Sequence, residues 1–370
     1  MKKILISLVS KQTIPNVELI KEFKSEIDEY IFACSKQTDS SISWIIKASD
    51  IDINKCDKIK VDAFDIDDIQ NKLTEYNFQD NNYYLNITGG TKIMIMAFYE
   101  FFKNKGARIY YVTGKDLEYI KIFPQIGERN FEFKTKITLA EYLNAYGFEF
   151  KESKPYKDLK DAQNIMSFLL KNDKSKYSEQ FEKIRLKRGK NYSYDENISQ
   201  FLKNINFSPI KDGLLNKHET KYLSGEWFEE YVFYNLKNEF NFSDNEIGTG
   251  YEIKKGKTPN ELDVLFMYHN RFYIIECKTS VIQEIKQDDG KIQKHKLLTE
   301  IIYKSDALRG KLGLNSNTYI FTLEEIKNQD DTPVKEYETI FNRAELSRIK
   351  ILSKKNFKSG EKIRNLLNIK

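Results

Sequence analysis

Short apolar segments alternate with amphipathic segments over residues 1–125, and this alternation restricts the possible folds more than any other feature. The apolar runs at 4–9, 41–48 and 83–87 are typical of strands that are buried within a sheet. The segments between them space apolar residues three or four positions apart, as amphipathic helices do. This order, with short loops, predicts an open and mostly parallel α/β sheet.

The same patterns predict individual elements of this region. A helix is expected to begin after Asn16, a good N-cap residue, and to reach Ile31. Its apolar face would consist of Val17, Ile20, Phe23, Ile27 and Ile31. Other expected strands lie at 58–64, 107–112 and 118–123, and other expected helices lie at 65–76 and 93–103.

Beyond residue 130 the order of elements changes. Helices are expected at 139–146 and 165–170, followed by a segment, 174–190, in which seven basic residues accompany two acidic ones. We interpret this segment as a helical connector with a solvated surface, and a nucleic-acid groove is the alternative. The remaining chain predicts a helix at 225–239, a meander of strands near 247–253, 261–268 and 272–278, a helix at 296–309 and a strand at 319–323.

Composition narrows the possible classes of protein. Hydrophobic residues make up 40% of the chain, too many for a disordered protein, yet no apolar run approaches the roughly 20 residues that cross a bilayer. The apolar start lacks a signal-peptide cleavage site, and the cysteines (Cys34, Cys56, Cys277) and three histidines are scattered. We therefore expect a cytoplasmic protein that binds any metal ion through oxygen.

The net charge of +5 is unevenly distributed along the chain. Residues 1–150 carry 20 basic and 22 acidic side chains, whereas residues 151–370 carry 40 and 33. A nucleic-acid partner is therefore expected to bind the second half.

Asp263, Glu276 and Lys278 form the sharpest candidate site. Glu276 and Lys278, two positions apart on a strand, share one face. We expect His269 and Asn270 to form the turn of a hairpin. Asp263 then lies opposite Glu276, and a register shift of two places it opposite Lys278 on the same face. Carboxylates this close favour a divalent cation that polarises a phosphate, and the structural alternative is an exposed hairpin with one salt bridge.

This spacing resembles the signature of the PD-(D/E)xK nucleases, with Asp263 followed by Glu276-Cys-Lys278. The first half of the signature is degenerate, because Pro259 lies four residues before Asp263 instead of beside it. The order of helix, meander, helix and strand also fits that fold. Lys304, on the following helix, could face the same site.

The resemblance implies metal ligands and a catalytic role. Glu226, on the first helix, would bind manganese or magnesium together with Asp263 and Glu276. The main-chain carbonyl of Cys277 would be a further ligand, and Lys278 would act on the attacking water. The expected catalytic residues are Glu226, Asp263, Glu276 and Lys278.

Two loops of the first region, 10–16 and 88–92, are candidate ligand sites. The second, Thr88-Gly-Gly-Thr-Lys92, joins a strand to a helix, so its glycines allow a ligand to approach and Lys92 and the helix N-terminus attract phosphate. It is neither GxGxxG nor a Walker A loop, and a Gly-Gly turn capped by Thr91 is the structural alternative. Both loops follow strands, so we expect them at the same sheet edge.

Together these loops resemble those of the CARF domain, the Rossmann-like sensor of cyclic oligoadenylates in type III CRISPR immunity. Asn86-x-Thr88-Gly-Gly-Thr-Lys92-x-Met94 is similar to the hallmark loop, and residues 10–16 are similar to the first ligand loop. The resemblance implies that the ring contacts Ser10, Gln12, Thr13, Asn16, Thr88, Gly89, Gly90, Thr91 and Lys92. It also implies a homodimer that binds one ring, cyclic tetra-adenylate, on its two-fold axis.

The expected organisation is a CARF-like sensor at 1–130, a helical connector at 131–215 and a PD-(D/E)xK nuclease domain at 216–370. The expected function is a metal-dependent nuclease, activated by cyclic oligoadenylate, that cuts single-stranded DNA or RNA and can nick supercoiled DNA in antiviral defence. The alternatives are a ligand-responsive transcriptional regulator without catalysis, a ring nuclease that degrades its activator, and a restriction-type endonuclease whose front half reads DNA.

Overall fold

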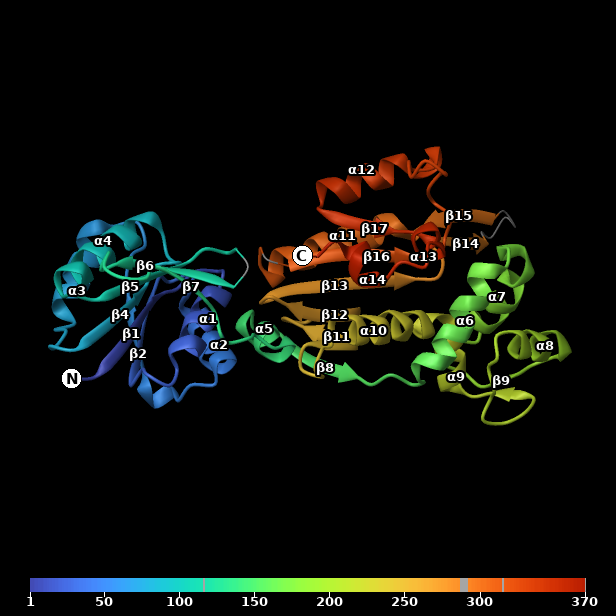
Figure 1. Ribbon diagram of the computed structural model, residues 1–370, viewed down its shortest axis with the longest axis horizontal. Coiled ribbons are helices and arrows are strands. Elements are labelled where there is room, and N and C mark those ends of the chain that lie inside the picture. Colours follow the sequence, from blue (N-terminus) through green and yellow to red (C-terminus); the bar gives the residue numbers. More distant parts are fainter. Residues whose placement is uncertain (116, 287–291, 315, 370) are drawn as a thin grey trace.

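The computed structural model describes residues 1–115, 117–286, 292–314 and 316–369. Two α/β parts follow one another along the chain, each built on its own sheet, and a group of helices from the middle of the chain lies beside the second sheet (Figure 1). No helix among these residues is long and apolar enough to cross a membrane.

The first sheet is mostly parallel, as predicted. Its strand order is β3-β2-β1-β4-β5-β6-β7, in which β5 pairs antiparallel with β6 and β6 with β7, while the other neighbours pair parallel. The strands are β1 (Lys3–Leu8), β2 (Glu29–Cys34), β3 (Cys56–Lys60), β4 (Asn82–Asn86), β5 (Arg108–Val112), β6 (Glu118–Phe123) and β7 (Asn130–Glu132). The helices between them are α1 (Ile14–Phe23), α2 (Asp39–Ser49), α3 (Ile66–Glu75) and α4 (Lys92–Asn104).

Helices cover both faces of this sheet, so a hydrophobic core lies on each face. Alternate residues of β1 are buried in one core or the other. Leu5 belongs to the cluster that contains Val17 of α1 and Ile45 of α2. Ile4 and Ile6 belong to the cluster on the other face, which contains residues of α3 and α4. Burial on both faces is why most residues of this strand are apolar.

Two predictions for the first sheet are wrong. Residues 41–48, predicted as a strand, lie in helix α2, where Ile42 and Ile45 are buried at helical spacing. The helix predicted to reach Ile31 ends at Phe23, and Ile31 lies in the buried strand β2. In both segments the apolar residues recur at spacings that a helix and a buried strand can each satisfy, so periodicity alone could not separate them.

The expected N-cap of α1 is also wrong. Thr13, not Asn16, precedes the helix. Pro15 lies in the first turn, where its missing N–H removes no helical hydrogen bond. Asn16 is fully buried inside the helix and donates from its side chain to the carbonyl of Leu8 (3.2 Å).

The second sheet has six strands in the order β17-β16-β13-β12-β11-β8. The strands β8, β11, β12 and β13 pair antiparallel, as the predicted meander requires, and β16 and β17 continue parallel to β13. Their bounds are β8 (Glu149–Ser153), β11 (Ile247–Lys254), β12 (Pro259–Tyr268), β13 (Arg271–Lys278), β16 (Ser316–Thr322) and β17 (Ile349–Leu352). Because β8 comes from the segment expected to be a helical connector, that segment also builds the second sheet.

The hairpin of β12 and β13 has the predicted turn. His269 and Asn270 both have positive φ (50° and 56°), as a two-residue hairpin turn requires. Tyr268 pairs with Arg271, and the ladder continues from there toward the other end of the strands. The turn therefore fixes the register that brings the charged residues of the two strands to one place.

A group of helices from residues 139–240 lies beside the second sheet, and its members pack against the sheet and against one another. They are α5 (Leu139–Ala145), α6 (Leu159–Lys171), α7 (Ser178–Arg185), α8 (Glu196–Asn204), α9 (Lys217–Lys221) and α10 (Trp227–Phe240). The remaining elements are β9 (Tyr192–Ser193), β10 (Leu214–Leu215), β14 (Ile282–Lys286), β15 (Ile292–Lys296), α11 (Leu297–Leu312), α12 (Glu338–Leu346), α13 (Lys354–Lys358) and α14 (Ile363–Leu367). Trp227 and Phe228 of α10 are fully buried in the core of this part.

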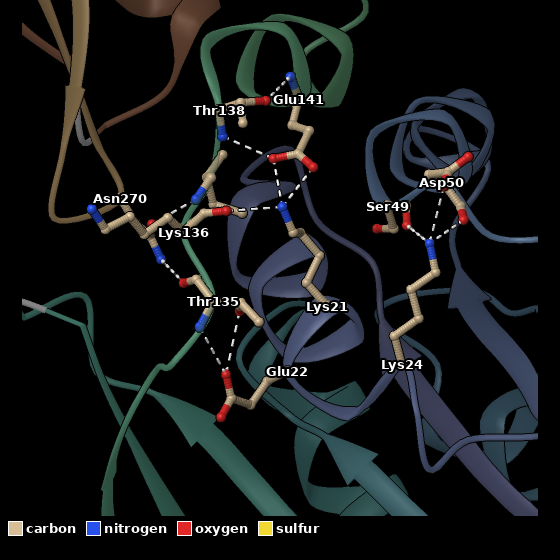
Figure 2. A network of polar contacts seen from close by, with 11 residues as sticks. Lys21, Glu22, Lys24, Ser49, Asp50, Thr135, Lys136, Thr138, Glu141 and Asn270 are labelled. Atoms are coloured by element: carbon tan, nitrogen blue, oxygen red, sulfur yellow. Dashed lines mark hydrogen bonds and ion pairs between the residues drawn. The ribbon is translucent and has the colours of Figure 1, made fainter. Parts of the chain in front are cut away.

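Residues 134–141, between the two sheets, form polar contacts with α1 on one side and with the β12–β13 turn on the other (Figure 2). Lys21 of α1 forms an ion pair with Glu141 of α5 (2.5 Å). The Glu22 carboxylate accepts from the main-chain N–H (3.3 Å) and the hydroxyl of Thr135. From the other side, the side-chain amide of Asn270 donates to the carbonyl of Thr135 (3.5 Å). Helix α1 and the β12–β13 turn are therefore joined through this segment.

Candidate functional site

Asp263 and Lys278 come together at the ends of β12 and β13 that lie away from the turn. The Asp263 carboxylate accepts from the ammonium of Lys278 (2.5 Å) and from the main-chain N–H of Cys277 (2.7 Å). The ammonium is also 3.4 Å from Glu276 Oε2. The structure thus brings together the three residues that the hairpin register predicted.

Both carboxylates are almost completely buried, with 6% of Asp263 and 2% of Glu276 exposed. Burial, followed by the charge of Asp263, raises the pKa of Glu276. Burial works against the charge of Lys278, but Asp263 and Glu276 outweigh it, so the pKa of Lys278 is raised. An exposed hairpin with one salt bridge does not describe this site, since its charges are buried and interdependent.

Helix α10 carries a further acidic residue, Glu229, that the sequence reasoning missed. Burial, and next the charge of Asp263, raises the pKa of Glu229 well above its ordinary value, while Lys278 lowers it. Glu229 therefore lies within electrostatic reach of both residues of the hairpin. Its position three residues after Glu226 could have revealed it, because residues so spaced lie on one face of a helix.

Glu226 itself lies just before α10 and is turned toward the connector. Its Oε1 forms an ion pair with Arg188 Nη2 (3.1 Å). Burial raises the pKa of Glu226, and the charge of Arg188 lowers it. The charge of Glu226 also acts on Glu229, so the two side chains lie near one another, but Glu226 has a basic partner of its own in Arg188.

Lys304 of α11 reaches the same group of carboxylates. Its ammonium is 3.7 Å from Glu276 Oε1 and donates to the main-chain carbonyl of Glu261 (2.8 Å). Two lysines from different elements, Lys278 and Lys304, thus contact one buried carboxylate.

Within the described ranges of the chain, no three His, Cys, Asp or Glu side chains are grouped closely enough to hold a metal ion. The ammonium of Lys278 lies between Asp263 and Glu276 instead. The chemistry of the donors nevertheless fits Mg²⁺ or Mn²⁺, because both are hard cations that prefer carboxylate oxygen. Burial, and next the charge of Asp263, raises the pKa of both Glu229 and Glu276, so a nearby cation would favour their ionised forms.

The loop at 88–92 connects β4 to α4 and lies against the end of β1. Thr91 is the N-cap, accepting from Met94 N–H (3.2 Å), and the Thr88 hydroxyl accepts from Val112 N–H (2.8 Å). A Cβ on Gly89 would lie 2.2 Å from the carbonyl of Leu8, so only glycine fits there. Gly90 has a positive φ of 79°, and Lys92 is exposed. The close approach places this loop beside the residues that follow β1.

The loop at 10–16, which follows β1, divides into exposed and buried parts. The Ser10 hydroxyl is partly exposed and donates to the carbonyl of Gln12 (3.1 Å). Thr13 is buried and donates to the carbonyl of Ala145 (2.5 Å), and Asn16 is buried as well. The two loops therefore share one sheet edge, as expected, with Ser10 and Lys92 accessible and Thr13 and Asn16 inside.

Gln12 is directed toward α5 and the segment that follows α11. Its side-chain carbonyl accepts from the hydroxyl of Tyr146 (3.1 Å) and from the main-chain N–H of Leu314 (3.0 Å). This loop thus contacts residues that are distant in the sequence and close to the second sheet.

Comparisons with protein families match the two parts separately. Residues 4–142 match the model of the Card1 CARF domain, and residues 216–359 match that of the Card1-like endonuclease domain. A search of curated proteins finds no match.

Two solved structures share the fold over nearly the whole chain. One is Can2 from Sulfobacillus thermosulfidooxidans in complex with cyclic tetra-adenylate, with a TM-score of 0.70, 21% identity and 95% of each chain covered. The other is protein VC1899 from Vibrio cholerae, with a TM-score of 0.73, 15% identity, and 96% of this chain and 95% of that chain covered.

Proposed function

Residues 4–142 of this chain belong to the Card1 CARF domain family and residues 216–359 to the Card1-like endonuclease domain family, and from this premise we propose a nuclease activated by a cyclic oligoadenylate. The observation that carries the proposal is the convergence of Asp263, Glu276 and Lys278 in the second part of the chain. Two buried carboxylates and a lysine on one strand face are the groups that metal-dependent phosphodiester hydrolysis requires.

In the proposed nuclease site, Asp263 and Glu276 would hold the divalent metal through their carboxylates. Glu229 or Glu226 supplies a further carboxylate from the start of α10, and the carbonyl of Cys277 is a further candidate ligand. When bound, Mg²⁺ or Mn²⁺ polarises the phosphate and lowers the pKa of water. Lys278 orients the attacking water and stabilises the charge that develops on the phosphate.

Lys278 occupies the place between the two carboxylates that would hold a metal ion. In this structure its ammonium lies 2.5 Å from Asp263 and 3.4 Å from Glu276, the two oxygens that would bind the metal. Two like charges cannot share these oxygens without strong repulsion. With a metal ion held by Asp263 and Glu276, Lys278 would be placed beside the attacking water and the phosphate instead of against Asp263.

The proposed sensor site consists of the exposed groups of the two loops at the edge of the first sheet. Lys92 and the N-terminus of α4 attract phosphate, and Ser10 and Thr88 offer hydroxyl groups. The remaining loop residues, Gln12, Thr13, Asn16, Gly89, Gly90 and Thr91, shape the loops or contact the ring. The likeness to Can2, solved with cyclic tetra-adenylate, supports this ring as the activator.

We propose that two copies of the chain bind one ring. A ring with two-fold symmetry matches a site built twice from the same loops on a two-fold axis. Ring binding would then shift the dimer toward a state in which the nuclease sites accept single-stranded DNA, RNA or supercoiled DNA. The proposed division is a sensor at 1–130, a connector at 131–215 and a nuclease domain at 216–370, acting in the cytoplasm in type III CRISPR defence.

One set of reactions tests this proposal. Purified protein is incubated with labelled single-stranded DNA, single-stranded RNA or supercoiled plasmid, with Mn²⁺, Mg²⁺ or EDTA, and with cyclic tetra-adenylate, cyclic hexa-adenylate or no ring. We expect cleavage that requires both a metal and one ring. Cleavage without a ring would show that the ring does not control the nuclease. Tight ring binding without any cleavage would favour a transcriptional regulator. Loss of the ring over time would reveal a ring nuclease.

A further inference from the structure

Two arginines of the connector reach the edge of the candidate nuclease site. Arg185, the last residue of α7, donates from Nη2 to the hydroxyl of Thr279 (3.3 Å), and Thr279 directly follows Lys278. Arg188, in the turn after α7, contacts Glu226. In Figure 1, α7 lies at the end of the sheet where β13 ends. These contacts come from a segment that belongs to neither matched family region.

Both guanidinium groups keep most of their hydrogen-bonding capacity. Arg185 and Arg188 are exposed residues. Among the described residues, Arg185 forms no ion pair with a carboxylate, although the charges of Glu182 and Glu324 act on it, and Arg188 contacts one oxygen of Glu226. A guanidinium carries five N–H donors in a planar fork that suits a phosphate, so each arginine can still bind one.

The two arginines are also positioned to act together. The main-chain N–H of Arg188 donates to the carbonyl of Arg185 (3.0 Å), so one tight turn joins them. Lys187, in the same turn, and Lys190, in the turn that follows it, are exposed and add to the positive charge of this surface. The surface lies directly beside the buried carboxylates.

The negative charge of the site opposes the approach of a nucleic-acid strand, and a basic surface beside it would offset this repulsion. Asp263, Glu276, Glu229 and Glu226 are gathered within the site, and Lys278 and Lys304 are held by these carboxylates. A nucleic-acid strand is a polyanion, and an acidic site repels it unless cations lie along its path. The metal would offset the charge at the scissile phosphate but not at its neighbours.

We propose that Arg185 and Arg188 bind the backbone phosphates next to the bond that is cut, and so set the strand across the nuclease site. The proposal rests on the proposed nuclease function and names the feature of the substrate that is recognised. Because phosphates are the same in every nucleotide, this contact gives affinity without base preference. The connector thereby becomes part of the substrate-binding surface.

A different role is possible for one of the contacts, and the test separates it. If the ion pair of Arg188 with Glu226 held the site inactive, its removal would raise cleavage in the absence of a ring. If Arg188 binds substrate, its removal lowers cleavage at low substrate concentration. The direction of the change therefore decides between the two.

The test uses the full chain with ring and Mn²⁺ and compares wild type with Arg185→Ala and Arg188→Ala. We expect each variant to raise KM for a labelled oligothymidylate about tenfold, with kcat changed less than about twofold. Arg129→Ala, which removes one exposed positive charge from the first part of the chain, is the matched control and should leave KM unchanged. Arg185→Lys should recover only part of the loss, because it restores the charge but not the fork.

A binding measurement keeps the inference testable without cleavage. Fluorescence anisotropy of the same oligonucleotide in EDTA, over a series of salt concentrations, should show a slope of log K against log salt that is smaller by about 0.7 for each arginine removed. Unchanged KM and an unchanged slope in both variants would overturn the proposal, as would cleavage without a ring in Arg188→Ala. A wild type that binds the strand with the expected slope but never cleaves it would overturn the proposed function alone.

Discussion

The side-chain carbonyl of Gln12 accepts a hydrogen bond from the main-chain N–H of Leu314, 302 positions further along the chain. Gln12 lies in the loop after β1, and Leu314 follows α11, the helix whose Lys304 contacts Glu276. The same region is tied by Tyr142 of α5, which donates to the carbonyl of Leu312 (2.7 Å). Through these contacts, a change in the loop would reach the proposed nuclease site by way of α11.

This link predicts that Gln12→Ala uncouples the two sites. Loss of both hydrogen bonds to Gln12 should lower the stimulation of cleavage by the ring about five- to tenfold, a coupling of ordinary size. The affinity for the ring, measured by calorimetry, should change less than the stimulation does. Tyr146→Phe removes one of the two donors and should have a smaller effect in the same direction. If ring affinity falls as much as stimulation, Gln12 contacts the ring instead.

Glu276→Ala should reduce cleavage at least about 100-fold, because it removes a buried carboxylate that the metal and Lys278 both require. Ring affinity should stay unchanged, since the loops at 10–16 and 88–92 are remote in sequence and belong to the other sheet. Full activity of this variant with ring and Mn²⁺ would show that the site has been assigned to the wrong residues.

Glu229 and Glu226 are expected to differ in how much each contributes to cleavage. We expect Glu229→Gln to lower cleavage more than tenfold and to raise the Mn²⁺ concentration that half-saturates activity, because Glu229 is within reach of Asp263. Glu226→Gln should have the smaller effect, because Glu226 is paired with Arg188. The reverse order in a manganese titration would return the role to Glu226.

Lys92→Ala should weaken ring binding about tenfold and raise by the same factor the ring concentration needed for cleavage. Lys92 is exposed at the N-terminus of α4, where its charge and the helix dipole act on the same phosphate. Lys55→Ala, another exposed lysine of the first part, is the matched control. An activation curve equal to that of wild type would mean that the ring binds elsewhere.

Glu18 predicts a pH dependence of stability. Burial raises the pKa of this carboxyl to about 8, although a hydrogen bond with Asn270 works in the other direction. The folded protein then retains a proton that the unfolded chain loses, so stability should fall between about pH 5 and pH 8, by at most about 1.4 kcal/mol per pH unit from this group.

Urea unfolding of wild type and Glu18→Gln at both ends of this range measures the effect. The amide cannot ionise, so the variant should lose less stability as the pH rises. Equal losses in the two proteins would show that Glu18 does not hold its proton in the folded state.

The sequence alone predicted what local patterns encode. Strand–helix alternation indicated the parallel sheet, and the pair His269 and Asn270 indicated the hairpin turn. Because side chains alternate strictly along a strand, that turn also predicted that Asp263, Glu276 and Lys278 share one face. Local pattern failed at 41–48 and at Ile31, where apolar spacing is compatible with either a helix or a strand.

Only the tertiary structure decided which distant groups join these local features. It brought Glu229 of α10 toward Asp263, directed Gln12 toward Leu314 and placed Arg185 against Thr279. Such contacts leave no periodic signal, because they depend on how helices and sheets pack and not on the spacing of neighbours along the chain. The sequence by itself determined the alternation of the first sheet, the hairpin turn and the face that Asp263, Glu276 and Lys278 share, and packing decided which helix and loop residues lie beside them.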